Sequence, residues 1–163
     1  KFYADNDERT IFFCKGALET VKKLGWSPDV VHCHGWMSAL VPAYLKTLYK
    51  EDPTFKNSKV VYSLYEDNFD TSLSAEFATK AIMNGMNAEH TEMYSEATNT
   101  ALNLGAISYS DAVVCACENI NEEVLKFVKK SNKPHLEFNS TSDYENYYNL
   151  YEEIASEELV SLA

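Results

Sequence analysis

The sequence predicts an α/β protein in which helices cover both faces of a parallel sheet. Short runs of β-branched and apolar residues alternate along the chain with longer segments whose apolar residues recur at helical spacing. The first expected strand, 30–34, begins apolar on both faces, as is typical of a strand buried on both sides. Strands that alternate with helices are joined by right-handed crossovers, which makes the sheet parallel. We therefore expect a single three-layer domain.

The element boundaries follow from turn residues and helix signals. A first helix is expected to begin near Asn6, where polar and acidic residues suit a helix start, and to end at Gly25. A Ser-Pro-Asp turn leads into the strand 30–34, which Gly35 ends. The remaining elements are expected to be a helix through 40–48, a strand at 59–65, helices at 75–83 and 93–109, a strand at 111–116, a helix at 121–130, a strand at 135–138 and a helix at 143–159. This order predicts a Rossmann-like fold.

Length and charge exclude several classes of function. The chain of 163 residues suits one domain that buries a real core. Its formal net charge of −11 argues against a nucleic-acid partner and against docking on anionic membranes. Nothing approaches the roughly 18 consecutive apolar residues that a membrane span needs. The acidity favours a neutral or locally compensated ligand.

The four cysteines, Cys14, Cys33, Cys115 and Cys117, each lie in an apolar stretch. They are too sparse for the disulfide framework of a small secreted domain, so we expect buried free thiols. The chain opens with Lys1 and shows no secretory signal. Together these features predict a cytoplasmic protein.

Candidate site residues are those that follow the strands, because ligands of open parallel sheets bind beyond the carboxyl ends of the strands. These residues are His34, Gly35 and Trp36 after the first strand, Tyr65 with its neighbours after the second, and 117–119 after the third. No glycine-rich phosphate loop and no Gly-x-Ser-x-Gly elbow is present.

The two histidines of the first strand, His32 and His34, are two residues apart and are expected on the same face of the sheet. They could share a metal ion, but His90 and His135 stand in no recognisable partner motif. Alternatively, His34 hydrogen-bonds a polar ligand at the strand exit while His32 remains a satisfied core residue. A third interpretation makes both purely structural. We predict no metal site.

The residues that follow the first strand, and a group of tyrosines near the end of the chain, also permit more than one interpretation. Gly35 allows a close backbone approach or a positive φ angle. Trp36 could offer its ring to the face of a sugar, or pack the following helix against the sheet. Near the end of the chain, four tyrosines fall at helical spacing and are expected to form a packing face. They are Tyr144, Tyr147, Tyr148 and Tyr151.

A family resemblance adds to this interpretation. Residues 28–42 read PDVVHCHGWMSALVP and resemble the P-D-x-x-H-x-H-D-W-x-x-A-L-x-P segment of bacterial glycogen synthases and plant starch synthases. Residues 6–19 are similar to the helix that precedes this segment in the family, and 110–114 resemble the start of a later strand. The resemblance covers roughly the first 130 residues, and these residues most resemble those of glycogen-synthase-like proteins of Bacteroidetes-type bacteria.

The resemblance implies the first domain of a GT-B-type glycosyltransferase, in which two Rossmann-like domains face each other across a cleft. Such enzymes transfer glucose from ADP-glucose to the non-reducing end of an α-1,4-glucan with retention of configuration, so the implied partners are a glucan such as glycogen and a sugar nucleotide. No cofactor is implied beyond the donor substrate. We expect residues 1–163 to be a single partial domain that lacks the second, nucleotide-binding domain and is inactive alone.

The resemblance implies a role for individual residues of this chain, each at the position that matches the family segment. The resemblance gives His34 a catalytic and substrate-binding role, because it matches the histidine thought to contact the transferred glucose, and Trp36 matches the family's tryptophan. Gly35 stands where the family has aspartate, Met37 where it often has histidine or glutamine, and Tyr65 where a T-x-H-N strand end has histidine. We expect each change to remove a polar group from the cleft. The alternative is therefore a non-catalytic glucan-binding or regulatory module derived from the synthase fold.

Overall fold

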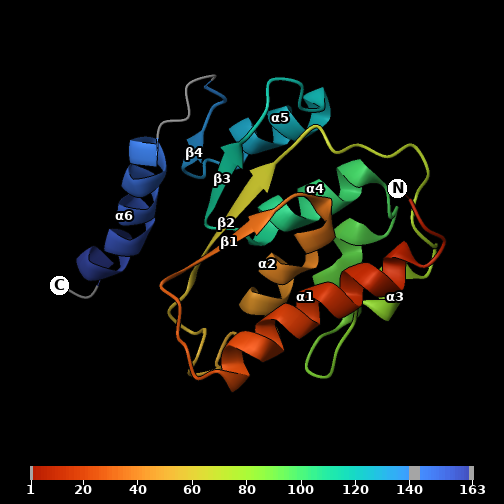
Figure 1. Cartoon of the computed structure of the whole chain (residues 1–163), viewed down its shortest axis with the longest axis horizontal. Helices are drawn as coiled ribbons and strands as arrows, with labels where there is room; N and C mark the ends of the chain where they lie inside the picture. The colour runs from red at the N-terminus through yellow and green to blue at the C-terminus, as the bar shows by residue number, and fades with distance from the viewer. Residues whose placement is uncertain (1, 140–143, 162–163) are drawn as a thin grey trace.

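The computed structural model describes residues 2–139 and 144–161, and for 157–161 the backbone alone. Four parallel strands lie side by side in chain order (Figure 1). They are β1 (Val30–His34), β2 (Lys59–Leu64), β3 (Ala112–Cys115) and β4 (His135–Leu136). The helices are α1 (Asn6–Lys23), η1 (Trp36–Ser38), α2 (Leu40–Lys46), α3 (Phe77–Lys80), η2 (Ala88–Tyr94), α4 (Asn99–Tyr109), α5 (Glu122–Lys130) and α6 (Tyr144–Ser161). The predicted α/β class is confirmed.

The two faces of the sheet carry different helix layers. Side chains of α1, α2, α4 and α5 form one continuous core with the inward residues of the strands, such as Tyr62 and Val113. This follows from the strand order, since successive right-handed crossovers between neighbouring strands place their helices on one face. On the other face lies α6, whose Leu150 and Ile154 are buried against Val61 of β2 (Figure 1).

One predicted helix begins too early. The periodicity predicted a helix over 93–109, whereas α4 begins at Asn99 and is preceded by the 3₁₀ segment η2. Ala97 adopts a positive φ of 53°, and the Thr98 side chain accepts a hydrogen bond from the Ala101 N–H at 3.1 Å. This threonine cap fixes the start of α4, because it satisfies a backbone donor of the first helical turn.

Other boundaries differ less. The helix expected at 75–83 is the single turn α3, and the strands expected at 111–116 and 135–138 are shorter, at Ala112–Cys115 and His135–Leu136. Pro42 lies in the first turn of α2, the position in which its missing N–H costs nothing. Within the part of the chain that the structure describes, no helix is both long and apolar enough to cross a membrane.

Candidate functional site

The residues at the carboxyl ends of β1 and β2 come together as the sequence predicts. Parallel pairing sets His34 opposite Ser63, and the exposed His34 ring meets Tyr65, which follows β2. Nδ1 of His34 and the Tyr65 hydroxyl are 2.9 Å apart. A tyrosine at this position therefore places a polar hydroxyl beside His34.

His32 and His34 lie on one face, as predicted, with their rings stacked at a centroid distance of 4.1 Å. His32 is satisfied on both nitrogens: Nδ1 is 2.6 Å from the Tyr151 hydroxyl and Nε2 is 2.7 Å from Oγ of Ser63. Burial, and to a smaller extent repulsion from the His34 ring when that ring is protonated, lowers the pKa of His32 to about 4. His32 is therefore a neutral, positioned ring that supports His34.

His34 itself is available to a ligand. Partial burial lowers the pKa of His34 below its ordinary value, so the ring is neutral at physiological pH. Because Tyr65 engages Nδ1, Nε2 is the ring nitrogen of His34 that is left for a ligand. A neutral imidazole can donate or accept one hydrogen bond at this position, which suits a sugar hydroxyl. Among the described residues, no group of three or more His, Cys, Asp or Glu side chains could hold a metal ion.

The loop after β1 is built around a carboxylate that the sequence analysis missed. Gly35 has φ 66° and ψ 175°, a conformation essentially restricted to glycine. A Cβ atom at this position would lie 2.5 Å from Oδ2 of Asp67, which also accepts a hydrogen bond from the Trp36 N–H at 3.2 Å. The Asp67 carboxylate thus occupies the space into which a side chain at position 35 would extend.

Asp67 is held in a partly buried position. Its Oδ1 atom is buried and accepts no hydrogen bond within the described part of the chain, and burial raises the pKa of this carboxyl despite the Trp36 N–H. Asn99 at the start of α4 donates to the Asp67 carbonyl at 3.3 Å, which ties the loop to the helix layer. Asn119, after β3, reaches Glu66 at 3.2 Å.

Trp36 packs against other aromatic residues. Its ring lies 4.9 Å from that of Phe69 in an edge-to-face arrangement and 6.5 Å from Phe2. Of the two interpretations, the structure therefore supports packing for this ring. Met37 turns toward α1, where its sulfur lies 3.4 Å from the Thr10 hydroxyl and its carbonyl 3.2 Å from the Cys14 sulfur. Neither side chain reaches His34 by a described contact.

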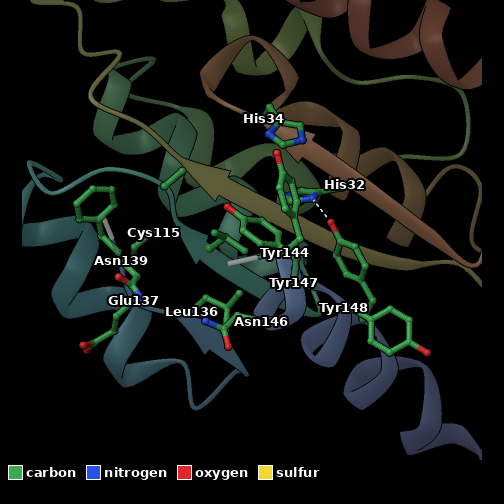
Figure 2. Close-up of a pocket in the computed structure, with 14 residues that line it drawn as sticks. His32, His34, Cys115, Leu136, Glu137, Asn139, Tyr144, Asn146, Tyr147 and Tyr148 are labelled. Atoms are coloured by element: carbon green, nitrogen blue, oxygen red, sulfur yellow. Dashed lines mark hydrogen bonds between the residues drawn. The ribbon is translucent and has the colours of Figure 1, made fainter. Parts of the chain in front are cut away.

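A cavity of about 660 Å³ extends from the two histidines along α6 (Figure 2). Two of the four tyrosines pack as predicted: Tyr147 and Tyr151 lie against the sheet. Tyr144 and Tyr148 are 84% and 61% exposed, which corrects the expectation of a uniform packing face. Figure 2 shows Tyr147 beside His32 and Tyr148 directed away from the histidines.

The cysteines are free thiols, as predicted. Cys14, Cys33 and Cys115 are buried, and Cys117 is half-buried. Burial raises the pKa of all four thiols above the ordinary value, to about 12 for Cys14. None is an activated nucleophile, because catalysis by cysteine requires a lowered pKa.

The parallel sheet, with a neutral histidine and a tyrosine at its carboxyl edge, defines an α/β domain whose candidate site lies where ligands of open parallel sheets bind, beyond the carboxyl ends of the strands. Comparison with known proteins specifies the family. Residues 1–135 match the starch synthase catalytic domain, and the chain belongs to this family.

Curated relatives agree with this assignment. The chain is similar to glycogen synthase of Clostridium perfringens, with 32% identity over 127 residues that make up 74% of the chain and 25% of that protein. Glycogen synthase of Elusimicrobium minutum is 46% identical over 63 residues, which are 39% of the chain and 13% of that protein. The chain thus spans about a quarter or less of the length of these relatives.

A solved structure shows the same fold. The catalytic domain of starch synthase IV from Arabidopsis thaliana, bound to ADP and acarbose, aligns with a TM-score of 0.61 and 20% identity over 85% of this chain and 30% of that one. Helix α6 lies beyond residues 1–135, the region that matches the family.

Proposed function

We propose that this chain forms one wall of the active site of a glucosyltransferase of the glycogen/starch synthase type. The observation that carries the proposal is the exposed, neutral His34, held by Tyr65 at the carboxyl end of β1 within a segment that matches the family. The donor is ADP-glucose and the acceptor is the non-reducing end of an α-1,4-glucan. ADP and acarbose in the solved relative are consistent with a sugar nucleotide and a glucan.

In this proposal His34 hydrogen-bonds a hydroxyl of the transferred glucose through Nε2. The hydrogen bond to Tyr65 fixes the orientation of the His34 ring, and the His32 ring stacks against it at a centroid distance of 4.1 Å. A second nucleotide-binding domain supplies the groups that stabilise the departing diphosphate, because positive charge is required where negative charge develops. The chain is one partial domain of a cytoplasmic enzyme, and its segment 28–42 favours a relationship to Bacteroidetes-type synthases that a phylogeny would test.

The test is glucosyl transfer from ADP-glucose to glycogen by the product of the complete reading frame. We expect His34→Ala to reduce transfer by about a hundredfold or more, equivalent to several kcal/mol of barrier. His135→Ala removes an exposed histidine at the edge of the sheet and serves as the matched control. Equal activity of wild type and His34→Ala would contradict the proposed role.

A second candidate is a non-catalytic glucan-binding or regulatory module. It is favoured by Gly35, whose glycine-only conformation excludes the aspartate of the family segment in this loop geometry. Glycogen binding without glucosyl transfer by the complete product would support this second candidate over the first.

A further inference from the structure

The outward side of α1 carries an apolar surface that is exposed to solvent. Phe12 stands at its centre and is 80% exposed, Ile11 lies beside it, and the exposed Phe13 widens it. A shallow hollow of about 520 Å³ runs along this side, lined by α1 and by Lys80 of α3. Figure 1 shows α1 in the helix layer on the side of the sheet opposite to α6. Exposed apolar surfaces of this kind mark sites of protein association.

The hollow is electrically balanced on an otherwise acidic molecule. Its lining contains two carboxylates, Glu8 and Glu19, and two ammonium groups, Lys15 and Lys80. Glu8 pairs with Lys80, whereas Lys15 forms no ion pair among the described residues. The formal net charge of −11 opposes the approach of a second copy to most of the surface. A balanced surface is where such an approach is least opposed.

The order of residues along α1 makes this surface complementary to itself. Glu8, Ile11, Phe12 and Lys15 succeed one another at intervals of three, one and three residues, which places them on one side of the helix over two turns. In an antiparallel pair of α1 helices, with a twofold axis between Ile11 and Phe12, each Glu8 faces Lys15 of the second copy. Two ion pairs then flank an apolar centre, as an isologous interface requires.

Gly16 provides room for the aromatic ring of a second copy. Side chains on a helix lean toward its N-terminus. In the antiparallel pair, each Phe12 ring therefore leans toward the turn of the other helix that follows its own Phe12. Gly16 lies in that turn, and a Cβ atom added to it would meet nothing within 4 Å. The ring thus packs over the open backbone of the glycine.

We propose that the outward side of α1 is an interface between two copies of this protein, packed antiparallel about a twofold axis. Each copy contributes Phe12 to the apolar centre and pairs its Glu8 with Lys15 of the other copy. The interface contains none of the candidate site residues at the carboxyl edge of the sheet. The inference therefore goes beyond the proposed function and does not depend on it.

The experiment is sedimentation velocity of the product of the complete reading frame over a range of concentrations. We expect the mass of wild type to approach twice that of a protomer as the concentration rises. Phe12→Ser should raise the dissociation constant about tenfold or more, because the interface loses its central aromatic ring in both copies. Phe12 is exposed, so this change opens no core. Tyr144→Ser, at an exposed aromatic residue of α6, is the matched control and should leave the constant unchanged.

Charge reversal tests the antiparallel arrangement itself. Glu8→Lys alone and Lys15→Glu alone each set like charges opposite one another at both ends of the interface, so each variant should associate more weakly than wild type. In a mixture of the two variants, one copy is positive at both positions and the other is negative at both. The mixture should therefore form a heterodimer with both ion pairs restored.

Each outcome bears on the proposal. A wild type that stays monomeric at every concentration, or a dimer that Phe12→Ser leaves unchanged, would overturn it. A monomer in which Phe12→Ser also lowers the free energy of unfolding would show instead that another segment of the protein covers this side of α1. A dimer that depends on Phe12, with no heterodimer in the mixture of charge variants, would overturn the antiparallel arrangement.

Discussion

Replacement of Gly35 should destabilise the fold through two separable terms. The first is backbone strain: φ 66° with ψ 175° is nearly exclusive to glycine and costs about 1–3 kcal/mol for other residues. The second is overlap of the new Cβ with Oδ2 of Asp67 at 2.5 Å, for which overpacking costs about 1–3 kcal/mol. We therefore expect Gly35→Ala to lower the free energy of unfolding by about 2–6 kcal/mol.

A double-mutant cycle with Asp67→Ala separates the two terms, because truncation of Asp67 removes the overlap and leaves the strain. The double variant should be more stable than additivity predicts by about 1–3 kcal/mol. The assay is urea unfolding followed by circular dichroism, analysed by linear extrapolation. Gly16→Ala, in the middle of α1, is the control. A Cβ atom added there meets nothing within 4 Å, so the free energy of unfolding should rise by roughly 0.5–1 kcal/mol. Additive effects of Gly35→Ala and Asp67→Ala would refute the inferred contact.

Two further predictions concern half-buried polar groups. The pKa of His32 is about 4 in the folded protein and about 6.5 when exposed, so the unfolded chain binds the proton first. The stability that the neutral His32 ring contributes is therefore complete above pH 6.5 and declines as the pH falls toward 4. His32→Gln should make the urea midpoint of unfolding less dependent on pH over this interval. Midpoints of wild type and variant that change in parallel with pH would contradict this. Lys133 donates to the carbonyls of Ile107, Ser108 and Ser110 at 2.5–2.8 Å and caps the end of α4. Lys133→Met should cost about 1.5–3 kcal/mol in urea unfolding, whereas the exposed control Lys130→Met should change stability by less than about 0.5 kcal/mol.

Local patterns predicted the elements well where one signal was sufficient. The strand 30–34 and the helix 122–130 follow from β-branched residues and from apolar spacing, both of which act over a few neighbours. The helix predicted over 93–109 began too early because the Thr98 cap and the positive φ of Ala97 outweighed helical periodicity. Threonine is a common helix cap, so Thr98 marks the start of α4 in the sequence itself, within the apolar pattern.

The sequence predicted where in the fold the candidate residues lie, but not which contacts they make. Placing His34 and Tyr65 at one edge of the sheet required only the rule for parallel strands. The carboxylate of Asp67 beside Gly35 joins loops that are 32 residues apart, and Tyr151 meets His32 across 119 residues. Such contacts depend on strand register and on which face α6 covers, which no local spacing encodes.

The unequal covering of the sheet has a consequence for which of its surfaces can change by substitution. Residues on the face of α1, α2, α4 and α5 interlock in one core, so a change there demands compensating changes in several elements. The opposite face meets α6, a single helix that follows the residues 1–135 matched to the family. Substitution along this one helix alters the walls beside His34 while β1 and its loop keep their geometry. The shape of this surface can therefore change through one helix, independently of the scaffold that holds the histidine.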